Sequence, residues 1–255
     1  MTDFTDTEMM IKVAADQLED GSKTFVGVGL PVLAANLAGR THAPNLITLY
    51  EGGIYRRTPS EAVAFTIDDP VLCSGADYTA DIYTVMGAQN RGEIDYSFLG
   101  GAQVDKYGNL NSTCIGSFED PDERIYVTGS GGANDMGSTM NNGIIIMPHS
   151  PRKLVEDVDF VTTPGYLDGP GAREEAGLSD GGPHCIITTK GLLYFDEDTK
   201  EAYLQAYYPG ESVEEIKQET GWDLKVADDV YEMEEPSEHE LKLLREEIDP
   251  EGLYL

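Results

Sequence analysis

Apolar and polar residues alternate along the chain with two different periods, one helical and one typical of strands. The stretch from Thr5 to Gly21 has the helical period, because Thr5 and Glu8 form a capping box and Gly21 supplies a stop. The apolar face of this stretch consists of Ile11, Ala14, Ala15 and Leu18. The pattern predicts an amphipathic helix as the first element.

Short apolar runs of strand length follow, separated by turn residues and helical patterns. The strand candidates are residues 24–28, 46–50, 94–100, 125–127 and 144–147. Between them, Pro31 stands where a helix accepts proline, and residues 78–91 have helical spacing. Such alternation predicts an α/β fold, with a mainly parallel open sheet covered by helices.

The second half of the chain has closely spaced strand candidates rich in β-branched and aromatic residues. These are residues 158–163, 184–189, 192–195 and 202–207, and the stretch 165–182 between them is expected to be a long surface loop. A short helix is predicted over 212–220, and a capping box at Ser237 and Glu240 predicts a C-terminal docking helix over about 237–249. We expect these strands to join the same unit, giving a single domain over 1–255.

The excess of acidic residues indicates the environment in which the protein works. The chain has 47 acidic and 17 basic residues, a formal net charge of -30, and the acidic residues are spread along its length. Such a field repels nucleic acid and anionic lipid, so neither is expected as a partner. Dispersed negative charge of this size is typical of halophilic proteins, whose surroundings screen repulsion over a few Å. We therefore expect a halophilic protein.

Cysteine usage and the amino-terminal residues bear on the compartment. Cys73, Cys114 and Cys185 are few and widely spaced, which supports neither a disulfide framework nor a zinc site. The amino-terminal residues include neither a basic region nor an apolar stretch, and no apolar run approaches bilayer length. We expect a cytoplasmic protein without a membrane partner.

One carboxylate and one glycine turn are candidates for chemistry in the first half. Glu51 follows the apolar run 46–50 and precedes two glycines, so a ligand could approach it closely, as a nucleophile requires. The simpler interpretation of Glu51 is a solvated turn residue. The Gly-Val-Gly-Leu-Pro segment at 27–31 leaves a strand and opens a helix, so its amides could receive an anionic oxygen or could form a plain turn.

Two further segments combine glycine with polar side chains. Residues 100–111 include the amides of Gln103 and Asn109, which could orient a carbonyl, although a hairpin with Tyr-Gly-Asn turn chemistry is the competing interpretation. Residues 129–135 read Gly-Ser-Gly-Gly-Ala-Asn-Asp, and consecutive amides in such a turn favour a developing oxyanion. The glycine density of this second segment favours function.

The remaining titratable residues give weaker indications. The four histidines have no metal-ligand or triad spacing, so we assign none a catalytic part and expect no metal: His42, His149, His184 and His239. Arg56, Arg57 and Lys106 lie near these segments in sequence and could meet phosphate or carboxylate, with surface charge as the default interpretation.

Taken in order, four of these segments resemble the β subunit of class I coenzyme A transferases, with the glutaconate CoA-transferase branch as the nearest likeness. They are Gly-Val-Gly-Leu-Pro, Tyr-Glu-Gly-Gly, Gly-Gly-Ala-Gln-Val-Asp-Lys-Tyr-Gly-Asn-Leu-Asn and Gly-Ser-Gly-Gly-Ala-Asn-Asp. Residues 147–155, 160–165 and the ending 248–255 are also similar. The resemblance covers nearly the whole chain and implies a fold of the NagB/RpiA/CoA-transferase type.

The resemblance also implies site residues and a partner. The nucleophilic glutamate of the family falls on Glu51, and its backbone oxyanion donors fall on Val28 and on Gly131 or Gly132. Gly29, Gln103 and Asn109 complete the implied substrate-binding set. The implied activity is ping-pong transfer between an acyl-CoA thioester and a carboxylate, with an α-type partner subunit and no bound cofactor.

Two alternatives stay open at this point. An acyl-CoA hydrolase with the same fold is one, although related steroid-catabolic hydrolases lack the glutamate that is present here as Glu51. A non-catalytic subunit of such a complex is the other. Gly52 stands where family members commonly carry Ser, Ala or Asn, so the resemblance does not name the acyl group.

Overall fold

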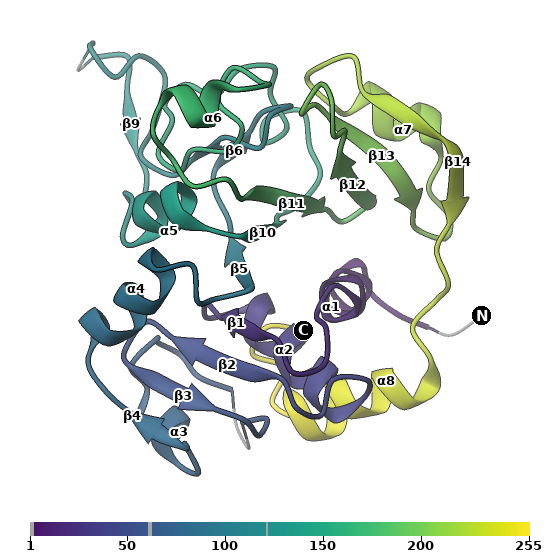
Figure 1. Ribbon diagram of the computed structural model, residues 1–255. Helices are drawn as coiled ribbons and strands as arrows, with labels where there is room; N and C mark the ends of the chain where they lie inside the picture. The colour runs from purple at the N-terminus through teal and green to yellow at the C-terminus, as the bar shows by residue number, and fades with distance from the viewer. Residues whose placement is uncertain (1–2, 61–62, 121) are drawn as a thin grey trace. The chain divides into compact units, whose positions relative to one another are not determined.

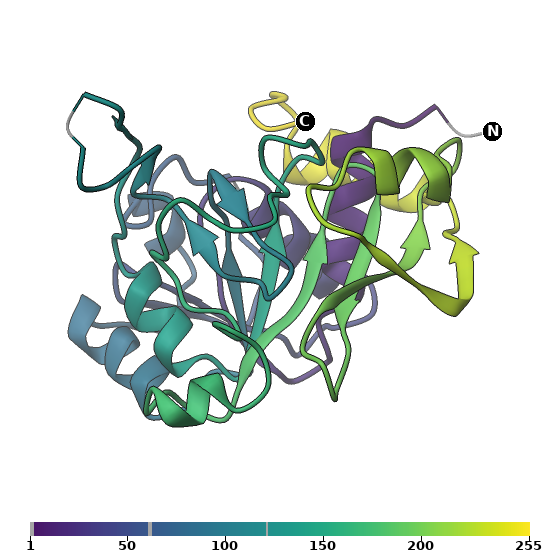
Figure 2. The same cartoon turned by 90° about the horizontal axis from the view of Figure 1, so that it is seen from above.

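The computed structural model describes residues 3–60, 63–120 and 122–255. The chain divides into two compact units, one formed by residues 1–98 with 234–255 and the other by residues 99–233. Each unit is built on a set of strands with helices packed beside them, as two views at right angles show (Figure 1 and Figure 2). The α/β class is confirmed, whereas the expectation of one domain over the whole chain stays a prediction.

The first unit opens with the predicted amphipathic helix. In α1 (Asp6–Asp16), the Thr5 side chain accepts a hydrogen bond from the backbone N–H of Glu8, and the Glu8 carboxylate accepts one from the backbone N–H of Thr5. The unit continues with β1 (Lys23–Phe25), α2 (Leu30–Arg40), β2 (Ile47–Tyr50), β3 (Ile54–Arg56), α3 (Pro70–Cys73), β4 (Tyr78–Thr79), α4 (Ile82–Asn90) and β5 (Tyr96–Leu99). The capping box predicted from two side chains is therefore formed.

The strands of the first unit lie in the order β5-β1-β2-β3-β4. β1 pairs in parallel with both β5 and β2, and the short strands β3 and β4 extend this core with antiparallel pairs. The carboxyl-terminal helix, α8 (Glu238–Lys242) continuing into the π-helix η1 (Leu243–Ile248), belongs to this unit, and Arg245 pairs with Glu8 of α1. The parallel core directs the ends of β1 and β2 to one edge.

The second unit is built on five strands, in the order β14-β13-β12-β11-β10. Their bounds are β10 (Asn142–Ile146), β11 (Gly182–Ile187), β12 (Gly191–Phe195), β13 (Ala202–Tyr207) and β14 (Lys225–Glu232). β10 with β11 and β13 with β14 are parallel, and β12 is antiparallel to both neighbours. The helices α5 (Ala133–Thr139), α6 (Ala172–Glu175) and α7 (Val213–Gln218) accompany these strands.

Two small hairpins of the second unit lie outside this set of five strands. β6 (Gln103–Val104) pairs with β7 (Leu110–Asn111), and β8 (Cys114–Ile115) pairs with β9 (Ile125–Tyr126). The hairpin interpretation of residues 100–111 is thus confirmed. The apolar run 125–127, expected in the series of parallel strands, instead forms an antiparallel arm whose side chains are largely exposed.

Three other expectations about elements are wrong. Residues 158–163 form no strand beyond a single bridge from Thr163 to Leu110, because they support the β6–β7 hairpin instead of a ladder. The helix expected from residue 78 begins at Ile82, because Asp81 caps it by accepting the N–H of Thr84. The stretch 165–182 is no plain surface loop, since it carries α6, with Arg173 buried beneath it.

No helix among the described residues combines the length and the apolar character that crossing a bilayer requires.

Candidate active site

Glu51 directly follows β2, at the edge where the parallel strands β1 and β2 both end. Pairing continues one residue past β1, because the N–H of Val26 donates to the carbonyl of Leu49 over 2.8 Å. The loop that leaves β1 contains Val28 and Gly29. The structure therefore brings Glu51, Val28 and Gly29 to the same edge of the first unit's sheet.

The turn after Glu51 is packed too closely for any residue but glycine. A Cβ at Gly52 would lie 2.7 Å from the carbonyl oxygen of Ile67, and one at Gly53 would lie 2.4 Å from that of Ala80. Gly53 also has φ 96° and donates its N–H to Tyr50 over 2.9 Å. Neighbouring backbone, and not room for a ligand, explains these two glycines, and the turn that carries Glu51 is held from two sides.

The Glu51 carboxylate has no partner among the residues that the structure describes. The side chain is half-buried, and it makes no hydrogen bond or ion pair with a residue that the structure describes. Tyr50, beside it, is fully buried, which raises the pKa of its phenol to about 12. The carboxylate of Glu51 is therefore available for an external ligand.

Backbone amides are open in the loop between β1 and α2. Gly29 caps α2 with φ 90° and makes no side-chain capping bond, and Pro31 lies in the first turn. A Cβ placed on Gly27 or on Gly29 would meet no heavy atom within 4 Å. Since the first amides of a helix have no partner in the helix, this loop can offer N–H donors to an anionic oxygen.

A second open loop lies in the second unit, before α5. Gly129 has φ 93° and Gly131 has φ 51°, and a Cβ on either would meet no heavy atom within 4 Å. The ends of the loop are fixed, because Gly129 donates its N–H to Ser112 and Ala133 donates to Ser130. Gly132 is the N-cap of α5. The loop has the form of an amide nest that can receive an oxyanion.

Gln103, in contrast, is buried, and its amide is used inside its own unit. Its Nε2 donates to Asp159 over 3.0 Å, and its Oε1 accepts from Asn111 over 2.7 Å and from the N–H of Asp159 over 3.0 Å. Asn111, which the sequence did not single out, also donates to the carbonyl of Cys114. These bonds tie the β6–β7 hairpin to residues 114–116 and 159.

Asn109 is also buried, and all its polar atoms are paired. Its Oδ1 accepts from the N–H groups of Gly165 and Leu167, while its Nδ2 donates to Leu167 and to the carboxylate of Asp105. Burial raises the pKa of Asp105 to about 6, against hydrogen bonds from Asn109 and Tyr107 that lower it. The structure gives both Gln103 and Asn109 a framework role, and their contact with substrate stays a prediction.

Of the basic residues near these segments, Arg56 differs from the default interpretation of a surface charge. Arg56 is 2% exposed and donates to backbone carbonyls, so it is not a surface charge. Arg57 is exposed, and Lys106 lies over the ring of Tyr107. Because Arg56 is buried and engaged with backbone, it is not an accessible site for a phosphate.

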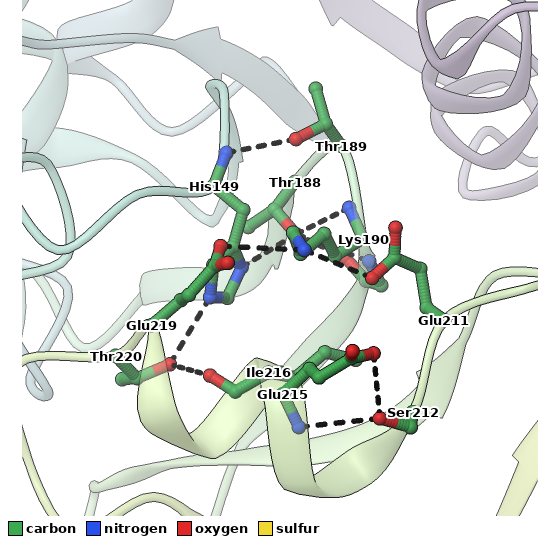
Figure 3. Close-up of polar contacts among 11 residues, drawn as sticks. His149, Thr188, Thr189, Lys190, Glu211, Ser212, Glu215, Ile216, Glu219 and Thr220 are labelled. Atoms are coloured by element: carbon green, nitrogen blue, oxygen red, sulfur yellow. Dashed lines mark hydrogen bonds and ion pairs between the residues drawn. The ribbon is translucent and has the colours of Figure 1, made fainter.

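His149, to which the sequence assigned no catalytic part, lies in a buried network of the second unit (Figure 3). Its ring nitrogens contact the hydroxyls of Thr188 over 3.1 Å and Thr220 over 3.2 Å, and burial lowers its pKa to about 4. Among the described residues, no group of three or more His, Cys, Asp or Glu side chains could hold a metal ion.

Comparison with known proteins assigns the family. Residues 7–219 match the model of the coenzyme A transferase family. The chain is 41% identical to the B-type subunit of glutaconate CoA-transferase from Acidaminococcus fermentans, over 100% of this chain and 96% of the relative. It is 36% identical to the B-type subunit of 3-oxoadipate CoA-transferase from Pseudomonas knackmussii, over 96% of this chain and 94% of the relative.

The fold leads to the same family. The crystal structure of glutaconate coenzyme A-transferase from Acidaminococcus fermentans superposes with a TM-score of 0.92 at 38% identity, over 99% of this chain and 98% of that one. Sequence and fold agree over the full length, including the segments that carry Glu51 and both open glycine loops. The chain belongs to the coenzyme A transferase family and is a B-type subunit of its class I enzymes.

Proposed function

We propose that this chain is the catalytic subunit of an acyl-CoA:carboxylate CoA-transferase and that Glu51 is its nucleophile. The observation that carries the proposal is the position of Glu51, which follows β2 at the edge where the open amide loop 27–29 begins. Its carboxylate is half-buried and has no partner in the described part of the chain. A carboxylate nucleophile next to N–H donors suits attack on a thioester carbonyl.

The reaction proceeds by four exchanges at carbonyl carbons. A Glu51 oxygen attacks the thioester carbon of the donor, CoA leaves as a thiolate, and an acyl-glutamyl anhydride forms. The thiolate then attacks the glutamyl carbonyl, which releases the donor acid as a carboxylate and leaves a glutamyl-CoA thioester. An acceptor carboxylate reverses both steps, so that Glu51 is regenerated and no proton is consumed.

Backbone amides stabilise the charge that develops in these steps. Each attack produces a tetrahedral oxyanion, and the N–H of Val28 or Gly29 is a donor at the Glu51 edge. The amides of Gly131 and Gly132 belong to the second open loop and are donors of the same kind, which their open surroundings support. Gln103 and Asn109 hold the loops of their unit in place. No bound cofactor takes part in this scheme.

The chain works with a separate α-type subunit. The two relatives are both named as B-type subunits, and this chain matches them over nearly their whole length. We expect full turnover when the two kinds of subunit are mixed. Turnover by the purified chain, with the partner shown to be absent by mass spectrometry, would contradict this arrangement.

The environment proposed from the sequence is a salt-rich cytoplasm. Of the described carboxylates, Glu8, Asp105 and Asp249 are buried and the others are at least partly accessible, so nearly all the negative charge faces solvent. Dispersed surface repulsion of this kind requires strong screening.

The test of the nucleophile is a covalent adduct. Incubating the complex with donor acyl-CoA and no acceptor should accumulate the glutamyl thioester, which hydroxylamine traps and borohydride reduces on the peptide that carries Glu51. Glu51→Gln keeps the size of the side chain and removes the anion, so transfer should fall by at least about 10⁴-fold, more than the roughly 10² to 10³ that one oxyanion donor is worth.

A matched control is Glu119→Gln, which makes the same change of charge at an exposed residue of the other unit. It should transfer at the wild-type rate. Transfer retained by Glu51→Gln, with no adduct on the wild-type peptide, would reject the nucleophile and favour the hydrolase or non-catalytic alternatives.

A further inference from the structure

Arg56 is a buried cation without a described counter-ion. Its guanidinium is 2% exposed, and no carboxylate among the described residues pairs with it. Four of its N–H groups instead reach backbone carbonyls, those of Thr58, Pro59, Leu72 and Ser74. An arginine buried with carbonyls alone has the geometry of a support for backbone.

Two of these carbonyls belong to the end of α3. A helix of four residues cannot satisfy its own last carbonyls, so Leu72 and Ser74 depend on an outside donor, and Nη1 of Arg56 contacts both. Leu72 is fully buried. Arg56 thus fixes the carboxyl end of α3 to strand β3.

The amino end of α3 is fixed by its own cap. The Asp69 carboxylate accepts the N–H groups of Val71 over 3.0 Å and Phe65 over 3.1 Å. The two residues before Asp69 lie against Gly52. A Cβ on Gly52 would be 2.7 Å from the carbonyl oxygen of Ile67 and 3.0 Å from the Cα of Asp68. Residues 63–74 therefore connect the guanidinium of Arg56 to the backbone directly after Glu51.

We propose that Arg56 is a positioning residue for Glu51, acting through residues 63–74, an inference that rests on the proposed function. With Arg56 in place, the backbone of residues 67 and 68 is held against Gly52, and the turn keeps the Glu51 carboxylate in one position. Without Arg56, the carbonyls of Leu72 and Ser74 lose their donor, and the backbone of residues 67 and 68 becomes more mobile. A misplacement of about 1 Å can cost about 10²-fold in rate.

The first experiment uses the assembled complex carrying Arg56→Lys, which keeps the charge but not the planar fork of donors. The number of active sites is measured as the amount of borohydride-reduced Glu51 peptide, and the turnover rate is divided by this number. The resulting kcat per labelled site is independent of how much of the variant is folded. We expect kcat per labelled site to fall by about 10- to 100-fold, with faster hydrogen exchange in residues 63–74. Arg245→Lys, in the same unit but paired with Glu8, should change kcat per labelled site less than about 2-fold.

The second variant approaches the same contact from the other side and serves if Arg56→Lys does not fold. Gly52→Ala places a Cβ against the Ile67 carbonyl. Because Arg56 still holds residues 67 and 68, the turn that carries Glu51 must move. Its kcat per labelled site should also fall. Because both changes disturb one contact, the loss in the double variant should be smaller than the product of the single losses.

Three results would overturn the inference. One is an unchanged kcat per labelled site in Arg56→Lys or in Gly52→Ala. Another is losses that multiply in the double variant. A wild-type complex without any labelled Glu51 would reject the proposed function and this inference with it, whereas a labelled wild type with unimpaired variants rejects the inference alone.

Discussion

Protonation of His149 should destabilise the second unit in mild acid. Thr220 donates its hydroxyl proton to the carbonyl of Ile216 over 2.8 Å, so it can only accept from the Nε2 of His149. The Thr188 hydroxyl accepts the N–H groups of Lys190 and Gly191, which uses both lone pairs of its oxygen, and its proton lies within reach of the Gly191 carbonyl and of Nδ1. The network therefore suits a neutral imidazole with its proton on Nε2, because a second proton on Nδ1 would find no free lone pair on the Thr188 hydroxyl.

The magnitude follows from the lowered pKa. Burial lowers the pKa of His149 from 6.5 to about 4, against the backbone of Ile216 and the charge of Glu219, which raise it, and with Lys190 adding to the lowering. The unfolded chain therefore binds the proton first, and the stability is complete above pH 6.5 and is lost as the pH falls. Each pH unit in that window costs the folded state about 1.4 kcal/mol, so pH 5 removes about 2 kcal/mol and the loss levels off near pH 4.

The assay compares the free energy of unfolding of the wild type with that of His149→Gln. The pH dependence contributed by all other titrating groups cancels in this difference. Gln supplies a donor near the place of Nε2 and does not titrate. Urea unfolding in molar KCl, at pH values from 4 to 7, should give free energies whose difference changes by about 1.4 kcal/mol per pH unit below 6.5. The exposed His239, replaced by Gln, should give a flat difference.

The reasoning would be refuted by a flat His149→Gln difference across this range. It would equally be refuted by an NMR titration in which the ring of His149 in the folded protein takes up a proton near pH 6.5.

Three further predictions concern stability. The melting temperature should rise steeply from low to molar KCl, because salt screens a net charge of -30, and an unchanged value would remove the halophile proposal. Asn109→Ala should cost roughly 2 to 4 kcal/mol in urea unfolding, since the side chain's four hydrogen bonds to Asp105, Gly165 and Leu167 are lost, whereas the exposed Asn134→Ala should cost almost nothing. Burial raises the pKa of Glu8, but the hydrogen bonds from Arg245 and Thr5 outweigh it, so the net pKa lies below 4.5. The stability that these bonds supply is therefore present above pH 4.5 and lost in acid. Arg245→Ala should therefore destabilise at pH 7, by about 1 to 3 kcal/mol in urea unfolding, and should shrink this acid dependence; equal stability of the variant at pH 7 would contradict it.

Local signals in the sequence determined most helices and central strands. The capping boxes at Thr5 and Ser237 each place two side chains three residues apart on their own backbone, so helix starts were readable without knowing the fold. The run that became β2 is short and mostly apolar, and β13 alternates buried and half-buried positions, so both patterns indicate strands without knowledge of the fold. The order of strand, glycine turn and helix also placed Glu51 at a strand end.

Pairing partners were not readable in this way. The run 125–127 and the run 158–163 have strand composition, yet one forms an exposed arm and the other supports a hairpin, because a strand depends on which backbone lies beside it. β14 is too exposed and too acidic to stand out as apolar. It forms because β13 offers a free edge.

At the candidate site, the sequence named the residues and tertiary structure decided what each can do. The glycines of the candidate segments looked alike in the sequence, but those at 52 and 53 are fixed by neighbouring backbone, while those at 27, 29, 129 and 131 face open space. Arg56 looked like surface charge and is buried among carbonyls. Burial and hydrogen bonding between residues far apart in sequence set these roles, and a linear pattern does not record them.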